Sequence, residues 1–305
     1  MRAIVLDDFS SPPRLRDLPT PTPGPDEVLV RVQASSINGF DAAVAAGWLQ
    51  GIVEHRFPVV MGKDFAGTVE ATGDAVTRFA VGDTVFGVVM KPYVGDGGLG
   101  EYVTVGEQYG IARAPHGLDL NIAGALGLAG TAARDTWEAV APAADAQVLI
   151  SGATGGVGAI AVQYAASAGA RVIATARPGA ATDFVRELGA DHVVDYTADL
   201  DTQVRAIAPE GVPAIIHLAG DLAHLAGLLA ARGRMSTTLG FATDQLSDGV
   251  MAVNADPSTE TLTRLAADAA RGLRVPITRS YALADAPQAL TDFTTGKLGK
   301  LAVTI

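Results

Sequence analysis

The sequence predicts an α/β chain in which a small antiparallel, barrel-like domain precedes a domain built on a doubly wound parallel sheet. Three observations lead to this fold class. Residues 1–118 contain short β-like runs separated by Pro and Gly, residues 119–254 alternate strand and helix patterns, and a glycine-rich turn stands between a strand and a helix at residues 152–158. Strands that alternate with helices are typical of a parallel sheet covered by helices on both faces.

The first domain is predicted from apolar and polar residues that alternate in runs such as 27–32, 67–73 and 82–87, with turn residues between them. Alternation over short runs indicates half-buried antiparallel strands. The C-terminal segment, 255–305, contains a helical pattern at 259–271 and a final strand at 301–305. We expect this segment to rejoin the first domain, so that one domain comprises residues 1–118 and 255–305 and the other comprises 119–254.

In the second domain, helical patterns such as 181–188, which ends before Gly189, lie between the expected strands. The strands are expected at residues 147–151, 171–175, 192–195, 213–218 and 234–239.

The glycine-rich turn has the composition and context of a dinucleotide-binding site. Ala153 stands at the first position of the G-x-G-x-x-G pattern, and glycines occupy the other two, at 155 and 158. Such a turn lets the backbone approach a pyrophosphate, and the N–H groups at the following helix N-terminus bind it. We therefore expect Gly155, Gly156 and Val157 to contact the cofactor. The alternative is a turn that only packs a helix onto the sheet.

The end of the second strand indicates which dinucleotide is bound. An acidic residue at this point would bond the ribose 2′-hydroxyl of NAD. Ala176 occupies the position and Arg177 follows it. A guanidinium offers paired donors to a 2′-phosphate, which a carboxylate would repel. These residues predict NADP(H), with a solvated Arg177 as the alternative.

Composition excludes several other classes of protein. The chain has 305 residues, a formal net charge of −11 and no Cys. The negative charge argues against nucleic-acid partners and anionic membrane surfaces. The absence of Cys excludes disulfides and thiolate zinc ligands. No apolar run suits a signal peptide or a membrane span, so we expect a cytoplasmic protein. The excess of Arg over Lys and the many Ala residues are typical of a bacterial source with a GC-rich genome.

Several short segments follow one another in an order that is typical of a known family. They are residues 23–30, Asn38-Gly39-Phe40-Asp41, 62–69, 97–103, 152–158, 188–191 and Gly299-Lys300-Leu301. Their order resembles the medium-chain dehydrogenase/reductase superfamily, in its zinc-independent quinone oxidoreductase (zeta-crystallin-like) branch. The resemblance implies a GroES-like catalytic domain, a Rossmann NADP-binding domain and a homodimer formed through an edge strand, for which 234–239 is a candidate.

The same resemblance bears on metal binding. The catalytic zinc ligands of metal-dependent relatives, Cys, His and Cys, correspond to Asn38, Lys63 and Gly127 in this sequence. An ammonium repels a cation and glycine has no side chain, so we expect no metal.

The resemblance also places candidate catalytic and substrate residues. Asn38 and Asp41 are retained, and Asn38 could orient the substrate or the nicotinamide ribose, or simply cap a turn. The family tyrosine is missing, because Ala43 and Leu49 stand at the comparable positions. Lys63 beside the expected substrate cleft could donate to an oxyanion; the alternative is an ion pair with Asp41 or Asp64. Trp48 and Tyr93 could line the pocket of an aromatic acceptor, or pack as ordinary aromatic residues.

Further cofactor contacts are implied by the family pattern. Thr131 resembles a threonine near the nicotinamide, and Tyr196 resembles a residue near the adenosine 2′-phosphate. Segments after the later strands are expected to offer backbone groups to the ribose and nicotinamide; they contain Ala219, Leu239, Gly240 and Phe241.

These features together predict an NADPH-dependent reductase that transfers hydride, without a metal, to quinones or other activated enones. Conjugation spreads the developing negative charge in such acceptors, so positioning and a few donors suffice. Two alternatives remain at this point. One is a reductase of 2-enoyl thioesters or biosynthetic enones, and the other is a non-catalytic NADPH-binding sensor or structural protein.

Overall fold

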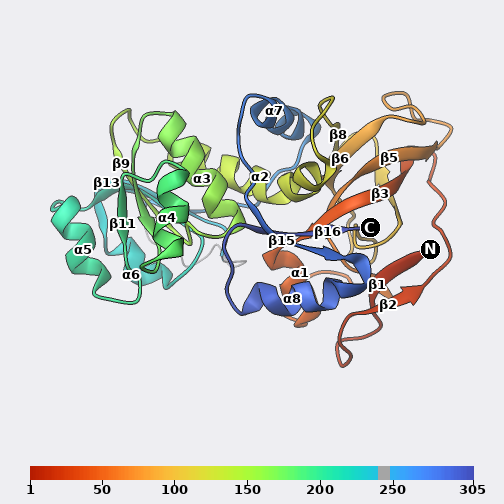
Figure 1. The fold of residues 1–305 in the computed structure, drawn as a ribbon, viewed down its shortest axis with the longest axis horizontal. Coiled ribbons are helices and arrows are strands. Elements are labelled where there is room, and N and C mark those ends of the chain that lie inside the picture. Colours follow the sequence, from red (N-terminus) through yellow and green to blue (C-terminus); the bar gives the residue numbers. More distant parts are fainter. Residues whose placement is uncertain (240–247) are drawn as a thin grey trace. The chain divides into compact units, whose positions relative to one another are not determined.

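The computed structural model describes residues 1–239 and 248–305 (Figure 1). The chain divides into two compact units. The first consists of Met1–Thr131 and Pro257–Ile305, and the second of Ala132–Asp256. The first unit is built mainly on antiparallel strands and the second on a parallel sheet with helices between its strands, so the predicted fold class is confirmed.

The first unit is rich in strands and holds both ends of the chain. Its strands are β1 (Arg2–Leu6), β2 (Arg14–Asp17), β3 (Glu27–Ile37), β4 (Val59–Val60), β5 (Asp64–Thr72), β6 (Thr84–Val88), β7 (Tyr102–Gly106), β8 (Ile111–Arg113), β15 (Ile277–Ala282) and β16 (Lys300–Thr304). Its helices are α1 (Gly39–Ala45), α7 (Thr259–Ala270), a 3-10 turn at Leu283–Asp285 and α8 (Ala286–Thr294), and α2 (Leu120–Val140) runs from this unit into the second.

The second unit alternates strand and helix. Its strands are β9 (Gln147–Ser151), β10 (Arg171–Thr175), β11 (His192–Val194), β12 (Val212–His217), β13 (Leu229–Thr237) and β14 (Val250–Ala252). Its helices are α3 (Gly156–Ser167), α4 (Ala180–Glu187), α5 (Leu200–Ile207) and α6 (Leu222–Ala226).

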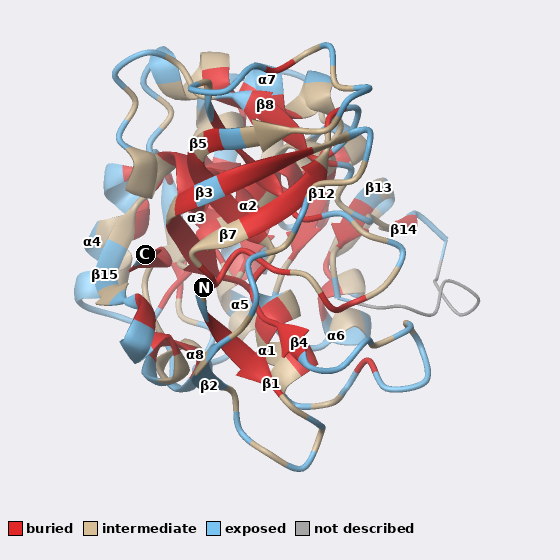
Figure 2. Cartoon of the chain, turned by 90° about the vertical axis from the view of Figure 1, so that its right-hand side faces the viewer, coloured by how far each residue is buried: buried red, intermediate tan, exposed pale blue. Residues whose placement is uncertain are grey.

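The main sheet of the first unit is antiparallel except at one edge. Its strand order is β15-β16-β3-β5-β6-β8, with β7 paired to β3, and β15 runs parallel to β16. The last strand of the chain therefore pairs with β3, and Leu301 lies opposite Ile37. As Figure 2 shows, strands such as β3 and β5 are mostly buried. This pairing brings the C-terminal Lys300 beside the end of β3, which positions the site described below.

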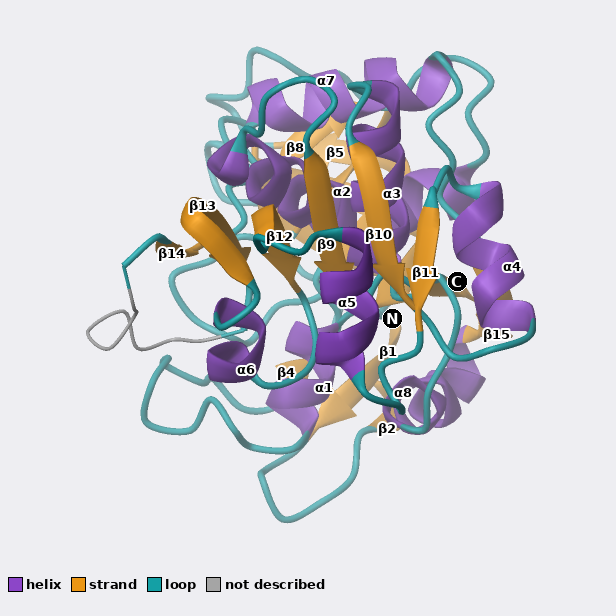
Figure 3. Ribbon diagram, turned by 90° about the vertical axis from the view of Figure 1, so that its left-hand side faces the viewer, coloured by secondary structure: helices purple, strands orange, loops and turns teal. Residues whose placement is uncertain are grey.

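The sheet of the second unit is parallel, in the order β11-β10-β9-β12-β13-β14 (Figure 3). Its central strand β9 contains the apolar run Val148–Ile150, which is fully buried. Continuous apolar runs are typical of parallel strands, because helices cover both faces of the sheet. The carboxyl ends of β9, β12 and β13 are adjacent, since His217 is in register with both Ser151 and Thr237.

One predicted feature of this sheet is wrong. The segment 234–239 was expected to supply an edge strand for dimer formation, but β13 has β12 on one side and β14 on the other. The short β14 was not predicted. The edges of the sheet are β11 and β14, so a dimer built through an edge strand would use one of these.

The division between the units falls inside α2, between Thr131 and Ala132, whereas the sequence led us to place a boundary at residue 118. The first half of α2 is held by the first unit. A Cβ at Gly124 would lie 2.8 Å from the carbonyl oxygen of Ala34, and the N–H of Leu128 donates to Asp64. Within the described residues, no helix is long and apolar enough to cross a membrane.

We expect Gly158→Ala to destabilise the second unit by about 2 kcal/mol, because a Cβ at this position would lie 2.2 Å from the carbonyl oxygen of Gly152. Thermal unfolding of the variant measures the loss. Gly106→Ala serves as a control, since nothing lies within 4 Å of a Cβ there. An unchanged melting temperature for Gly158→Ala would contradict the close approach of helix and turn.

Candidate functional site

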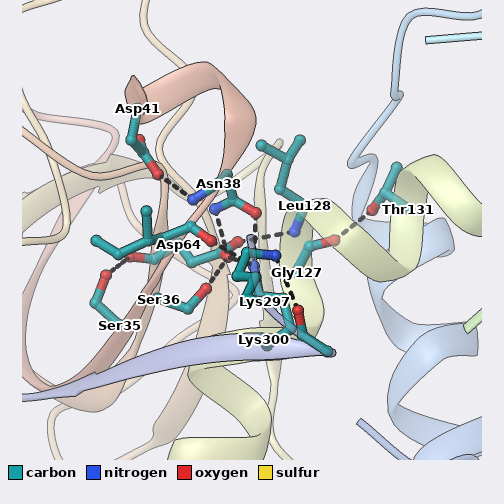
Figure 4. A network of polar contacts seen from close by, with 12 residues as sticks. Ser35, Ser36, Asn38, Asp41, Asp64, Gly127, Leu128, Thr131, Lys297 and Lys300 are labelled. Atoms are coloured by element: carbon teal, nitrogen blue, oxygen red, sulfur yellow. Dashed lines mark hydrogen bonds and ion pairs between the residues drawn. The ribbon is translucent and has the colours of Figure 1, made fainter. Parts of the chain in front are cut away.

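The first unit contains a buried polar network centred on the carboxylate of Asp64, which has no exposed surface (Figure 4). Its Oδ2 accepts hydrogen bonds from Ser36 Oγ at 2.5 Å and from Asn38 Nδ2 at 2.8 Å. Its Oδ1 accepts from the backbone N–H of Leu128 at 2.8 Å. The ammonium of Lys300 lies 3.4 Å from Oδ2. Four elements, β3, β5, β16 and α2, therefore meet at one carboxylate.

Lys300 supplies the positive charge of this network. Its Nζ donates to Asn38 Oδ1 at 2.6 Å and to the carbonyl of Ile37 at 3.2 Å. Burial lowers the pKa of Lys300, and the charges of Asp64 and Asp41 act in the opposite direction. Lys297 lies nearby, and burial together with the charge of Lys300 lowers its pKa to about 8.

The network occupies both ends of the Asn38 side chain, since Nδ2 donates to Asp64 and Oδ1 accepts from Lys300. Asn38 is also the N-cap residue of α1 and is 6% exposed. The side chain therefore holds α1 on the network, and its amide nitrogen and amide oxygen each have one partner there. The expectation that Asn38 orients the substrate stays a prediction.

Asp41 lies in the first turn of α1, where its Oδ2 accepts from the N–H of Asn38 at 2.8 Å. The side chain is buried. Burial raises the pKa of Asp41 to about 7, with a smaller contribution from the charge of Asp64, while the bond from Asn38 acts against the rise. Asp41 can therefore exchange a proton near neutral pH, as a general acid requires.

Lys63 lies near Asp41 but is bonded elsewhere. Its Nζ donates to the carbonyl of Val89 at 2.8 Å and lies 4.7 Å from the centre of the Phe40 ring. Burial lowers the pKa of Lys63, and the charge of Asp41 partly offsets this effect. The alternative that Lys63 pairs with Asp64 is wrong, because the cation beside Asp64 is Lys300.

Asp41 and Lys63 line one small pocket of the first unit, together with Phe40, Met61 and Asp96 among others. The pocket has a volume of about 10 Å³. A cavity of this size holds about one water molecule, which needs two or more polar partners. The structure thus brings two of the three predicted catalytic residues together around a space suited to a water rather than a substrate.

The two predicted pocket aromatics do not line this space. Trp48 is 74% exposed. The hydroxyl of Tyr93 donates to Asp96 Oδ2 at 2.9 Å, and the guanidinium of Arg56 lies 3.7 Å from the centre of its ring. Both the ring face and the hydroxyl of Tyr93 are therefore engaged within the first unit.

In the second unit, the glycine-rich turn has the geometry of a phosphate-binding cradle. Gly152 adopts a positive φ of 68°, its N–H donates to Thr175 Oγ1 at 3.0 Å, and its carbonyl accepts from the N–H of Gly155 at 3.0 Å. Gly155 is the N-cap residue of α3, which begins at Gly156. The free N–H groups of this helix end are available to an anion.

The residues predicted to recognise a 2′-phosphate are also brought together. Ala176 is buried, and its N–H donates to the carbonyl of Val194 at 3.0 Å. Arg177 is exposed, and its guanidinium lies 5.6 Å from the centre of the Tyr196 ring. The Tyr196 side chain is 48% exposed. A cation and an aromatic ring thus stand together just beyond the ends of β10 and β11.

The remaining predicted cofactor contacts are placed as follows. Ala219 and Leu239 are exposed in the segments after β12 and β13. Gly240 and Phe241 lie outside the described residues. Thr131 belongs to the first unit, is fully buried and donates from Oγ1 to the carbonyl of Gly127 at 2.8 Å.

Sequence reasoning missed the roles of Lys300 and His217. Lys300 lies in the Gly-Lys-Leu segment noted for its resemblance, but a single lysine beside the C-terminal strand gave no sign of its partner. His217 lies within the predicted strand 213–218, and the sequence assigned it no role. It is 1% exposed, and both of its ring nitrogens are hydrogen-bonded.

Comparison with known proteins identifies the family. Residues 24–116 match the model of the alcohol dehydrogenase GroES-like domain, and residues 156–260 match that of the zinc-binding dehydrogenases. A chloroplastic quinone oxidoreductase, QR1 of Triphysaria versicolor, is 32% identical over 232 residues, which are 73% of this chain and 69% of that protein. The chain belongs to the medium-chain dehydrogenase/reductase superfamily, in its quinone oxidoreductase branch.

Other relatives and structures agree with this assignment. The chain spans 63% of the length of a chloroplast envelope quinone oxidoreductase homologue from Arabidopsis thaliana, to which it is 32% identical over 67% of its own length. The quinone oxidoreductase structure from Coxiella burnetii has a TM-score of 0.85 at 26% identity, and the alignment covers 100% of this chain and 99% of that one. A mycobacterial structure in complex with NADPH has the same TM-score and identity and is covered over 100% of both chains.

We expect Lys300→Met to lower the free energy of unfolding by about 3–5 kcal/mol, because it leaves the Asp64 carboxylate buried without its cation. Urea unfolding measures the change. Arg264→Met is the control, since Arg264 pairs with Glu260 on the surface of α7, is 54% exposed and should contribute much less. Equal effects of the two substitutions would contradict a central role for Lys300.

We expect Asp41→Asn to change how stability depends on pH. Between pH 4 and 7 the folded wild type binds the Asp41 proton more tightly than the unfolded chain does, because the pKa is raised from 3.8 to about 7. Wild-type stability attributable to this group is therefore present below pH 4 and is lost as the pH rises through 7.

The asparagine variant lacks this loss, so its free energy of unfolding relative to wild type should rise by a few kcal/mol, on the order of 1–4, between pH 4 and 7.5. Urea titrations at several pH values measure the difference. Asp183→Asn, at an exposed position in α4, serves as a control. Parallel stability curves for wild type and Asp41→Asn would rule out the raised pKa.

Proposed function

We propose that this protein is an NADPH-dependent oxidoreductase that reduces quinones or other activated enones by hydride transfer without a metal. The observation that carries the proposal is the contact of Arg177 with Tyr196 beyond β10, a strand that is followed by the buried Ala176, next to a glycine-rich turn at a helix N-terminus. The family assignment supports the same class of reaction.

The second unit offers a site that fits a dinucleotide. The absence of a side chain at Gly158 lets α3 begin against the carbonyl of Gly152, so that the backbone N–H groups of Gly156 and Val157, in the first turn of the helix, can bind a pyrophosphate. The exposed segments at Ala219 and Leu239 follow neighbouring strands at the same carboxyl edge of the sheet. Cofactors of α/β proteins bind outside this edge.

The preference for NADPH rests on charge and geometry at the adenosine end. No carboxylate follows β10 directly, since Ala176 and Arg177 occupy these positions. The Arg177 guanidinium can form paired hydrogen bonds with a 2′-phosphate, and the Tyr196 ring beside it can cover the adenine or donate from its hydroxyl. The related mycobacterial structure in complex with NADPH agrees with this preference.

The residues at the family's metal positions do not fit a zinc ion. The Nδ2 of Asn38 donates to Asp64, the side chain of Lys63 is itself a cation, and Gly127 has no side chain. A Cβ at position 127 would lie 2.9 Å from Asp64 Oδ1, which explains the glycine. Asp64 is already balanced by the ammonium of Lys300. Among the described residues, no three His, Asp or Glu side chains are grouped so that they could hold a metal ion.

When bound, NADPH supplies a hydride to the acceptor. The balanced reaction also consumes one proton for each acceptor reduced. Asp41 holds a proton near neutral pH and shares its water-sized pocket with the Lys63 ammonium. We assign these two side chains the role of holding that proton, delivered through the water that the pocket can contain.

A second substrate class has a specific observation in its favour. The chain is 38% identical over 217 residues to a mycocerosic acid synthase-like polyketide synthase of Mycobacterium tuberculosis, in a match that covers 70% of this chain and 10% of that protein. An enone held as a biosynthetic thioester would undergo the same hydride transfer. Conjugation to the carbonyl makes either acceptor reactive without a metal.

The direct test is turnover of the purified protein with NADPH or NADH against quinones, linear enones and 2-enoyl thioesters, followed as loss of reduced cofactor. The proposal predicts NADPH-dependent reduction of at least one class. Tight NADPH binding with no reduction of any acceptor would overturn the catalytic proposal and leave the binding site in place.

We expect Arg177→Asp to weaken NADPH binding by at least tenfold, because the substitution replaces a guanidinium that donates hydrogen bonds to the 2′-phosphate by a carboxylate that repels it. The affinity for NADH should change less or should increase. Titration calorimetry with each nucleotide measures both dissociation constants. Arg186→Asp, which makes the same charge change at an exposed position of α4, is the control. If both variants lose NADPH affinity equally, the effect is one of net charge and Arg177 has no special place.

A further inference from the structure

Three neighbouring strands of the second unit end in a row of polar side chains that the reaction described above does not use. Ser151, His217 and Thr237 end β9, β12 and β13, and they are in register across the sheet. All three are almost fully buried, at 3%, 1% and 1% exposure. Buried polar groups of this kind are retained only when they are hydrogen-bonded.

His217 makes two hydrogen bonds that together fix its tautomer. Nε2 lies 3.1 Å from the carbonyl oxygen of Gly220, and Nδ1 lies 2.8 Å from Thr237 Oγ1. A carbonyl oxygen can only accept, so Nε2 carries the proton. In the neutral ring Nδ1 must then accept, and the Thr237 hydroxyl donates to it. Burial lowers the pKa of His217 and thus favours this neutral form.

The donors form a chain with a single direction. The N–H of Leu239 donates to Thr237 Oγ1 at 3.0 Å, and His217 donates to Gly220. The single proton of the Thr237 hydroxyl has two acceptors within reach, and we place it on His217 Nδ1 at 2.8 Å rather than on the Leu239 carbonyl at 3.3 Å. Thr237 and His217 each accept one hydrogen bond and donate another, and hydrogen bonds linked in this way strengthen one another in a dry environment. The chain joins the segment after β13 to the segment after β12.

Ser151 also fixes the segment after β12. Its Oγ accepts from the N–H of Leu218 at 3.1 Å and from that of Ala219 at 3.4 Å. Gly220 adopts a φ of 94°, which lets the backbone turn its carbonyl toward His217 before α6 begins. The two segments joined in this way contain the exposed residues Ala219 and Leu239, which were assigned above to the cofactor.

We propose that His217 is a positioning residue for NADPH: its ring, in the Nε2–H tautomer, fixes the spacing of the Ala219 and Leu239 segments, so that their backbone groups are preorganised for the ribose and nicotinamide. The inference rests on the proposed function, since it requires that these segments contact the nucleotide. His217 touches no reacting atom, and its effect is exerted through the two segments.

Single substitutions can remove either partner of the hydrogen bond between His217 and Thr237. His217→Gln keeps an Nε2 donor for the Gly220 carbonyl but has no acceptor at the position of the ring Nδ1, which faces Thr237, whereas Thr237→Val removes the hydroxyl and keeps the shape. Thr237→Ser retains the hydroxyl and should rescue binding. Thr136→Val is the matched control: Thr136 is a fully buried hydroxyl of the same unit that donates to the carbonyl of Ala132 inside α2.

Calorimetric titration with NADPH, together with the KM values for NADPH and acceptor, tests the proposal. The expected result is a rise in the NADPH dissociation constant of about tenfold for His217→Gln and for Thr237→Val, with the acceptor KM unchanged. Because both substitutions break the same link, the double variant should lose little more than either one. Thr237→Ser and Thr136→Val should bind NADPH as wild type does.

Folded variants whose melting temperature is lowered but which bind NADPH within twofold of wild type would show that these hydrogen bonds only stabilise the sheet. This result would overturn the inference. The proposed function would then stand, because the wild type would still bind and oxidise NADPH. A wild type that fails to bind NADPH would overturn the proposed function and this inference with it.

Discussion

The ion pair between Lys300 and Asp64 is the interaction on which the first unit is organised. Both side chains are removed from water, and a buried charge is tolerated only when it is paired and hydrogen-bonded. Asp64 meets this condition with donors from Ser36, Asn38 and Leu128 in addition to Lys300. The residues that satisfy one carboxylate therefore also fix where β3 ends, where α1 begins and how α2 approaches the sheet.

Beside this network, Asp41 and Lys63 share a small pocket, and these are the side chains that we assign to the proton of the reaction. In the second unit, His217 and Thr237 satisfy each other at the carboxyl edge of the sheet. In both units, buried polar side chains position backbone segments and helix ends.

Much of this organisation could be predicted from the sequence, because it depends on local patterns. The parallel strands and the glycine turn were predicted within a few residues, since continuous apolar runs and a strand–turn–helix context are local signals. Tyr196 was placed near the 2′-phosphate, and so near Arg177, only through the resemblance to the family, and the structure brings the two side chains together. The edge position of 234–239 was wrong, because β14 pairs with β13 from a segment of only three residues with no pattern of its own.

The buried pairings could not be predicted, because they join residues far apart in the chain. Lys300 and Asp64 are separated by 236 positions, and nothing in the composition near either one indicates its partner. Lys63 was the more conspicuous cation, since it occupies a position where relatives carry a metal ligand, yet it bonds a backbone carbonyl instead. Which of several lysines meets a buried carboxylate is decided by the pairing of β16 with β3, a property of the whole sheet.

Metal-free hydride transfer is tested most directly by isotope tracing in protein of measured metal content. NADPH deuterated at the transferable position of nicotinamide C4 would be incubated with the best linear enone, and the product analysed by mass spectrometry. The proposed function predicts one deuterium on the carbon that accepts the hydride. It also predicts that protein with far less than one metal ion per chain reacts at the same rate as protein that contains metal. Activity that rises and falls with bound zinc, or product without deuterium, would contradict it.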